Sequence, residues 1–126
     1  MSELKKWKKK AWAAFSAYIR QKYANRDGLV ECVTCDASGH WKNFQCGHFI
    51  DGRNNAVLYN ERLCRVQCVT CNVFKKGNKV AYTLYMLNTG HTKEWIENAE
   101  SLKHKSVRMT AADHREIYEL YKEWLA

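Results

Sequence analysis

The sequence predicts an α+β protein that is mostly helical, with a small metal-clipped core between its helices. Both ends of the 126-residue chain carry apolar residues at the three- and four-residue steps of amphipathic helices. The stretch between them is rich in turn residues and short strand-like pieces. Two Cys-Val-Thr-Cys sequences, Cys32–Cys35 and Cys68–Cys71, lie near the two ends of that stretch.

The first element is a predicted helix over residues 3–25, which no Gly or Pro interrupts. Like charges crowd its first turns and oppose the helix dipole, so this end should fray unless an anion such as a phosphate docks on it. The alternative is a solvated charged face. The charges in question are Lys5, Lys6, Lys8, Lys9 and Lys10, and the apolar stripe is Leu4, Trp7, Ala11, Phe15, Tyr18 and Ile19.

The middle of the chain should be built from short pieces. Asn25–Gly28 ends the first helix, and residues 29–49 read as short strands around the first cysteine pair. Residues 51–55 form a turn-rich loop, and Ala56–Tyr59 is predicted to be a short strand. A helix should begin at Cys71 and pass through Asn72, with residues 75–78 either interrupting it or separating it from the next one.

Three further helical segments are predicted after residue 79. Val80, Leu84 and Leu87 mark one apolar face, which residues 88–90 should end. Thr92 can cap a short helix that carries Trp95, Ile96 and Ala99. Thr110 and Asp113 resemble a capping box that opens the last helix. Its stripe, which could pack on the chain's own core or on a second subunit in a homodimer, is Ile117, Leu120, Tyr121, Trp124 and Leu125.

The length favours one domain, residues 1–126. Its expected parts are a basic N-terminal helix over 1–27, a zinc-bound core over 28–79 and a helical part over 80–126. No stretch approaches the roughly 20 apolar residues that span a bilayer, and the lysine-rich start does not resemble a secretory signal. We therefore expect a cytoplasmic protein with no membrane partner and with reduced cysteines.

The paired cysteines predict a structural zinc ion. Two thiolates separated by two residues can sit on one tight turn and reach one tetrahedral ion, and two such turns complete a four-sulfur shell. The ligands would be Cys32, Cys35, Cys68 and Cys71, and the ion would add stability that a small core lacks. A disulfide framework is the competing interpretation. Cys46 and Cys64 are expected to be buried as small apolar side chains.

The formal net charge of +8, from 21 Lys and Arg against 13 Asp and Glu, favours a polyanionic partner. Charge alone allows nucleic acid, an acidic membrane surface, or a basic protein with no such partner. Together with the cysteine turns it favours nucleic acid. The expected phosphate contacts are the five N-terminal lysines, Arg20, Arg53, Lys75 and Lys76.

Two polar residues could carry phosphodiester chemistry. His48, between the two cysteine pairs, is the best candidate for a general base that deprotonates water. Its alternative role is that of a surface or packed histidine. Asn72 directly follows the last thiolate, so its amide oxygen is a plausible ligand for Mg²⁺ or Mn²⁺. Its alternative role is a helix N-cap.

The sequence resembles the phage NinG (Rap-type) recombination nucleases. Gly47-His48-Phe49-Ile50, Gln67-Cys68-Val69-Thr70-Cys71-Asn72 and Gly77-Asn78 carry the resemblance, which covers roughly residues 10–100. A more distant likeness joins phage endonuclease VII. The resemblance implies a zinc-clipped, HNH-like ββα-metal fold with His48 as general base, Asn72 as a catalytic-metal ligand and the four paired cysteines as structural zinc ligands.

The sequence departs from the HNH pattern at two places. The residue before the base is usually a metal ligand, and here it is Gly47. Gln45, Cys46 and Asp51 are the candidates for the second protein ligand. The middle Asn of the pattern is also displaced, so its role is open between Asn54, Asn55 and Asn60.

The resemblance implies an HNH-like endodeoxyribonuclease that acts on branched recombination intermediates such as Holliday junctions or D-loops. A non-catalytic zinc module that binds DNA or protein is one alternative. A non-specific or packaging-associated HNH nuclease, which shares the site but not the preference for branches, is the other.

Overall fold

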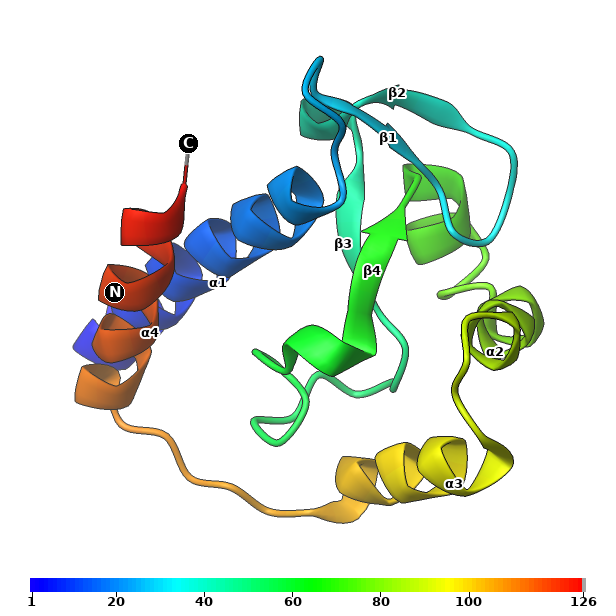
Figure 1. Ribbon diagram of the computed structural model, residues 1–126. Helices are drawn as coiled ribbons and strands as arrows, with labels where there is room; N and C mark the ends of the chain where they lie inside the picture. The colour runs from blue at the N-terminus through cyan, green and yellow to red at the C-terminus, as the bar shows by residue number, and fades with distance from the viewer. Residues whose placement is uncertain (126) are drawn as a thin grey trace.

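The computed structural model describes residues 1–125, in which a small hairpin lies between two groups of helices (Figure 1). The described strands form two antiparallel two-stranded sheets, β1 with β2 and β3 with β4. The strands are β1 (Leu29–Glu31), β2 (Ser38–His40), β3 (Gln45–His48) and β4 (Cys64–Gln67). The α-helices are α1 (Glu3–Lys22), α2 (Lys79–Asn88), α3 (Lys93–Ser101) and α4 (Ala111–Trp124), and shorter helical turns are η1 (Trp41–Asn43), η2 (Glu61–Leu63), η3 (Thr70–Phe74) and η4 (Leu102–His104).

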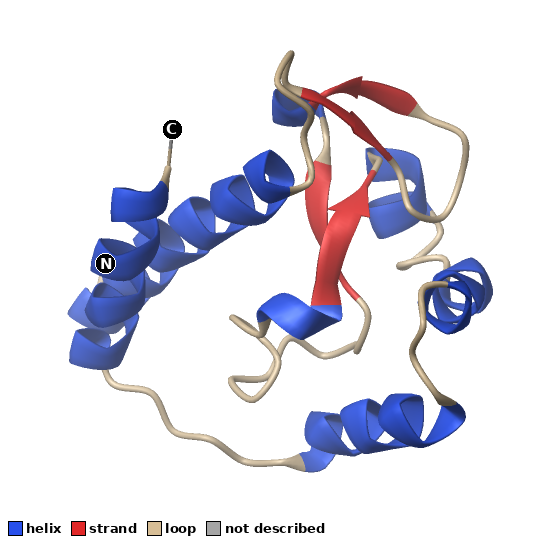
Figure 2. Ribbon diagram, in the orientation of Figure 1, coloured by secondary structure: helices blue, strands red, loops and turns tan. Residues whose placement is uncertain are grey.

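Helices α1 and α4 lie side by side along one flank of the hairpin (Figure 2). The predicted basic helix starts where expected, because Ser2 caps it by accepting from Lys5 N, but it ends at Lys22 and not at residue 25. The predicted capping box of α4 is confirmed. Tyr121 meets Phe15 edge-on with ring centroids 5.0 Å apart. The C-terminal stripe packs in part on the chain's own first helix, whereas its Leu120 and Trp124 are 47% and 59% exposed.

The hairpin that carries His48 pairs β3 with β4. In its register Cys46 faces Val66 and His48 faces Cys64. The predicted strand at Ala56–Tyr59 is wrong, since these residues form turns. The true partner strand was missed because its apolar–polar alternation, Cys64-Arg65-Val66-Gln67, is only four residues long, and burial does not follow that alternation since all four residues are buried.

The helix predicted to run through Asn72 is only the π-helical turn η3. Lys75 N donates to Thr70 O at 2.8 Å, five residues back. The chain then passes through positive φ angles at Lys76, Gly77 and Asn78, which no α-helix contains. Residues 75–78 therefore separate η3 from α2 rather than interrupt one helix.

The apolar face predicted for α2 is wrong, although its end at residue 88 is confirmed. Val80 and Leu84 are 77% and 54% exposed, and the buried residues are Tyr82 and Met86. The O–H of Tyr82 donates to Gly47 O on β3 at 2.8 Å. A hydrogen bond to the hairpin thus selects a face that apolar spacing alone did not reveal. The predicted Thr92 cap of α3 is confirmed.

Three clusters of buried side chains surround the hairpin and use its residues. Cys46 and Cys64 pack with Phe15 and Tyr121, which confirms their predicted role as small buried side chains. Val66, which lies on the same face of the hairpin as Cys46 and Cys64, packs with Cys32 and Cys71 in a second cluster. A third cluster joins Phe49 and Ile50, just after β3, to α2 and α3. Across residues 1–125, no helix has both the length and the apolar character required to cross a bilayer.

Candidate metal centre and adjoining pocket

The two cysteine pairs come together at one point. The first pair lies in the loop between β1 and β2; of the second pair, Cys68 directly follows β4 and Cys71 lies in η3. The four Sγ atoms lie within 4.8 Å of one another, and the Sγ atoms of Cys35 and Cys68 are 3.6 Å apart. Zn–S bonds of about 2.3 Å arranged tetrahedrally require S–S separations of about 3.8 Å. All six cysteines are free. The predicted disulfide alternative is therefore wrong in this structure, and the four paired thiols could hold a metal ion such as zinc.

Protein donors also point at the sulfur atoms. Ala37 N donates to Cys35 Sγ and Cys71 N to Cys68 Sγ, each at 3.4 Å. Asn78 Nδ2 donates to Cys71 Sγ at 3.5 Å. Donors of this kind would help to orient the sulfur ligands of a bound metal.

Asn72 follows the last cysteine, and its side chain ties η3 to β3. Its Nδ2 donates to Gln45 Oε1 at 2.6 Å. The residue lies inside the π-helical turn, whose N-cap position is Val69, so the N-cap alternative is wrong. Because the amide nitrogen is committed to Gln45, the oxygen Oδ1 is the atom of Asn72 that an external cation or donor can use.

His48 is held at the end of β3 by a backbone oxygen and an aromatic ring. Its Nε2 lies 3.0 Å from Leu58 O, and because a carbonyl can only accept, the proton must sit on Nε2. The other nitrogen, Nδ1, then carries a free lone pair. The imidazole stacks on Trp12 with centroids 5.0 Å apart.

The charge state of His48 follows from its surroundings. Burial lowers the pKa of His48 below its ordinary value, and the positive charges of Arg53 and Lys79 lower it further, against the opposing effect of the Leu58 carbonyl. The imidazole is therefore neutral at pH 7 and able to accept a proton at Nδ1. This is the protonation state that a general base needs.

One pocket of about 450 Å³ brings the two predicted site residues together. It lies between the first half of the hairpin, α1 and η3. Its polar walls come from segments far apart in the chain, and they combine one imidazole, two carboxamides and two guanidinium groups. The lining residues are Trp12, Ser16, Arg20, Phe44, Gln45, Cys46, His48, Arg53, Asn72 and Val73.

The two arginines of the pocket differ in freedom. Arg20 Nε donates to Ser16 O, its Nη1 donates to two backbone carbonyls near η1, and burial lowers its pKa. Arg53 is exposed, and its guanidinium lies 4.5 Å from the centre of the Trp12 ring. Arg53 is therefore the exposed cation of the pocket, whereas Arg20 is held by backbone carbonyls.

The remaining predicted phosphate contacts are exposed but do not line this pocket. Lys75 and Lys76 follow η3 on the surface. The five N-terminal lysines are exposed along α1, where Lys6 and Lys10 lie over the Trp7 ring at 5.3 Å and 5.1 Å. These basic groups could contact a long polyanion that extends beyond the pocket.

The pocket fits a divalent cation in part. Asn72 and Gln45 offer amide oxygens, but no carboxylate lies among its described lining residues. Of the predicted alternatives for a second ligand, Asp51 pairs instead with Lys79 at 3.5 Å, and Cys46 packs in an apolar cluster. Mg²⁺ is usually bound by one or two carboxylates together with substrate phosphates. A phosphate would therefore have to bring the negative charge that this donor set lacks.

The structure explains why position 47 is glycine. A Cβ at Gly47 would lie 1.9 Å from Gln67 Oε1, which fills the space that a ligand side chain before His48 would use. The Nε2 of Gln67 donates to Thr34 Oγ1 and to Gly77 O, while its buried Oε1 has no partner in the described part of the chain. Sequence reasoning assigned no role to Gln67, and the unusual glycine was the only sign of it.

The three asparagines left open for the middle position take different roles. Asn54 Nδ2 donates to the carbonyls of Leu102 and Lys103, and its backbone carbonyl accepts from the amide of Leu58. Asn54 thereby orders the loop that presents the Leu58 carbonyl to His48. Asn55 donates to a carbonyl before α4, and Asn60 caps η2.

Fold and site together define a class of small α+β proteins in which a four-cysteine centre adjoins a pocket with one imidazole and two carboxamides. A family model described as "Bacteriophage Lambda NinG protein" matches residues 1–125. The chain belongs to the NinG family, which confirms the family that its sequence predicts.

Relatives of the chain come from several phages. The chain is similar to "Protein ninG" of Escherichia phage 933W, with 32% identity over 94% of this chain and 56% of the relative. It is 31% identical to "Protein ninG" of Escherichia phage lambda, over 94% of this chain and 55% of the relative. The chain thus spans about half the length of these curated relatives. No solved structure matches it.

Proposed function

We propose that this chain is a metal-dependent endodeoxyribonuclease that acts on branched DNA, with Holliday junctions or D-loops as its substrates. The observation that carries the proposal is the meeting of His48 and Asn72 in one pocket beside Arg20 and Arg53. Phosphodiester hydrolysis needs a base for the water, a Lewis acid at the leaving oxygen and cations on the phosphate. The pocket offers a neutral base, an amide oxygen that could help to hold the metal ion, and two cations.

In this proposal His48 removes the proton from the attacking water. The Leu58 carbonyl holds the proton on Nε2, so Nδ1 is the atom that accepts. Stacking on Trp12 fixes the plane of the ring, and burial keeps it neutral. A positioned base of this kind contributes typically about 10²–10⁴-fold to the rate.

Mg²⁺ or Mn²⁺, held partly by Asn72, would supply Lewis-acid stabilisation of the charge on the leaving oxygen. Gln45 holds the amide of Asn72 in place through its Nδ2. Arg53 neutralises the phosphate from the open side of the pocket. The antiparallel β3–β4 pair followed by η3 is compatible with an HNH-like ββα-metal core, although its helical element is a single turn.

The basic surface outside the pocket suits recognition of DNA shape. Lys75, Lys76 and the N-terminal lysines are exposed and could contact backbone phosphates, which carry no base sequence. Binding through such contacts should weaken steeply with added salt.

The direct test compares cutting of a labelled four-way junction with cutting of a linear duplex of the same sequence. We expect nicks near the branch point that require added Mg²⁺ or Mn²⁺, and slower cutting of the linear duplex. Equal rates on the two substrates would favour a non-specific nuclease. Tight binding with no cutting under either cation would favour a non-catalytic zinc module and would overturn the proposal.

A further inference from the structure

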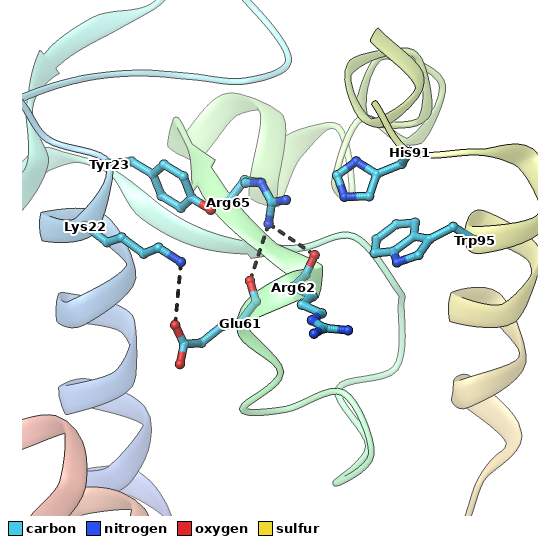
Figure 3. A pocket seen from close by; sticks show the side chains of 7 residues that line it. All are labelled: Lys22, Tyr23, Glu61, Arg62, Arg65, His91 and Trp95. Carbon is cyan, nitrogen blue, oxygen red and sulfur yellow. Dashed lines mark hydrogen bonds and ion pairs between the residues drawn. The ribbon is translucent and has the colours of Figure 1, made fainter. Parts of the chain in front are cut away.

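A second pocket of about 570 Å³ lies beside the hairpin and contains none of the residues discussed so far as site residues (Figure 3). It lies between the end of α1, the η2–β4 segment and the start of α3. The register of the hairpin places Arg65 opposite Gly47 and Cys64 opposite His48. Because neighbouring residues of a strand point to opposite faces, Arg65 emerges on the other face from His48. The lining residues are Lys22, Tyr23, Glu61, Arg62, Arg65, His91 and Trp95.

The charge of this pocket is positive and is not balanced from within. Glu61 is its one acidic side chain, and Glu61 pairs with Lys22 at 3.6 Å and accepts from Tyr121. Arg62 is exposed and has no ionic partner in the described chain. The positive charges of Arg62 and Arg65 are therefore not neutralised within the pocket and can attract an external anion.

The Arg65 side chain is held in place by the protein and is not a free cation on the surface. It is 9% exposed, and its Nη1 donates to the carbonyls of Glu61, Arg62 and Cys64 at 2.8–3.3 Å. These bonds fix the guanidinium, while its Nε and Nη2 have no acceptor among the described residues. The guanidinium carbon Cζ of Arg65 also lies 5.6 Å from the centre of the Tyr23 ring. A planar, preorganised donor pair of this kind suits a phosphate group.

The opposite wall of the pocket is aromatic. Figure 3 shows His91 and Trp95 across from Tyr23 and Arg65. The His91 and Trp95 rings lie 4.1 Å apart between centroids, and the Met86 carbonyl lies 3.1 Å from His91 Nδ1. That bond places the proton on Nδ1 and leaves Nε2 as an acceptor. Flat aromatic groups opposite fixed cations are the features that hold a base and its phosphate in proteins that bind single-stranded DNA.

We infer that this pocket binds an unpaired nucleotide of single-stranded DNA, with its base against His91 and Trp95 and its phosphate on Arg62 and Arg65. Its volume falls in the range of about 300–1,000 Å³ that small-ligand sites occupy. The inference deepens the proposed function and rests on it for its biological meaning, because branched DNA exposes unpaired nucleotides near the branch. A site on the face away from His48 would let one strand be held while another lies at the cutting pocket.

The test measures binding and not cutting, so it is independent of the proposed nuclease activity. Fluorescence anisotropy of a labelled oligothymidylate of about eight nucleotides is followed without added divalent cation and without chelator, which preserves the cysteine centre. Arg62→Ala and His91→Ala should each weaken binding about tenfold, the size expected for loss of a base or phosphate contact. Arg108→Ala removes an exposed arginine outside the pocket and should leave binding within about twofold.

Three results would overturn the inference. The first is unchanged binding in both Arg62→Ala and His91→Ala. The second is wild-type binding of a duplex of equal length as tight as binding of the single strand. The third is competition by thymidine monophosphate as effective as that by unlabelled oligonucleotide, which would assign the pocket to a free nucleotide. Loss of junction cutting alone would bear only on the proposed function.

Discussion

The four-cysteine centre and the pocket that holds His48 are joined by a single peptide bond, between Cys71 and Asn72, yet they are built in opposite ways. In the centre, four thiols from this chain converge on one point and leave no position for an outside group. In the pocket, His48 Nδ1 and Asn72 Oδ1 have no partner among residues 1–125, and no carboxylate balances the two arginines. The closed set is suited to hold the fold, and the open set is suited to receive a substrate.

The largest effect should come from breaking the closed set. Cys68→Ser removes one thiolate, and structural zinc sites contribute about 10–16 kcal/mol of apparent binding free energy at pH 7 in small domains. We expect the variant to lose bound zinc and to lose the cooperative unfolding transition of the hairpin region. Metal analysis and thermal melting measure both changes.

Cys46→Ala is the matched control, because Cys46 is buried but lies outside the thiol cluster. It should keep one zinc per chain and lose only the smaller stability of a truncated core side chain. Equal zinc content in Cys68→Ser and the wild type would contradict the role of the centre.

A second prediction concerns the glycine before His48. Gly47→Ala would place a Cβ 1.9 Å from Gln67 Oε1, and the carboxamide of Gln67 is fully buried. Overpacking of this kind costs typically about 1–3 kcal/mol. Chemical denaturation should therefore show a lower free energy of unfolding. In Gly39→Ala the nearest atom is a Phe44 ring carbon at 3.3 Å, so a much smaller loss is expected there.

The pH dependence of DNA cutting tests the role of His48 as the base in the open pocket. Burial lowers the pKa of His48 below its ordinary value of about 6.5. The base is active when neutral, so the rate should be level at pH 7 and above, and it should fall as the pH drops through that lowered pKa. Single-turnover rates at fixed cation concentration measure this. A rate that already halves between about pH 8 and pH 7 would show that another group controls the reaction.

The smallest expected effect is that of Arg53→Ala. The side chain is exposed and makes no ion pair in the described structure, so folding should not change. Affinity for DNA should fall modestly, and the slope of log affinity against log salt should decrease by about one unit, as for one lost phosphate contact. An unchanged slope would place Arg53 outside the DNA interface.

The same contrast decides what could be predicted from sequence. The cysteine turns, the Thr92 cap and the Thr110–Asp113 capping box are local patterns of a few residues, and the structure has each of them. The meeting of His48 with Asn72 was predicted from family resemblance and from the cysteine clip. Spacing along the chain alone does not contain it.

What sequence reasoning missed depends on contacts between distant segments. The apolar–polar alternation of β4 covers only four residues, and all four are buried. The buried side of α2 is selected by the bond from Tyr82 to Gly47. Gln67 could not be connected to Gly47 before the register of the hairpin was known. Patterns formed by a few neighbouring residues can be predicted from the sequence, whereas the choice of a buried face depends on contacts in the assembled core.

We propose that the imidazole of His48 is the general base for hydrolysis and that the cysteine centre maintains the shape of its pocket. The most direct test is the single-turnover cutting rate of a four-way junction by His48→Ala beside His104→Ala, which removes an exposed histidine outside the pocket. We predict a fall of about 10²–10⁴-fold for His48→Ala, with zinc content and junction binding retained, and a wild-type rate for His104→Ala. Equal rates in the two variants would contradict the account.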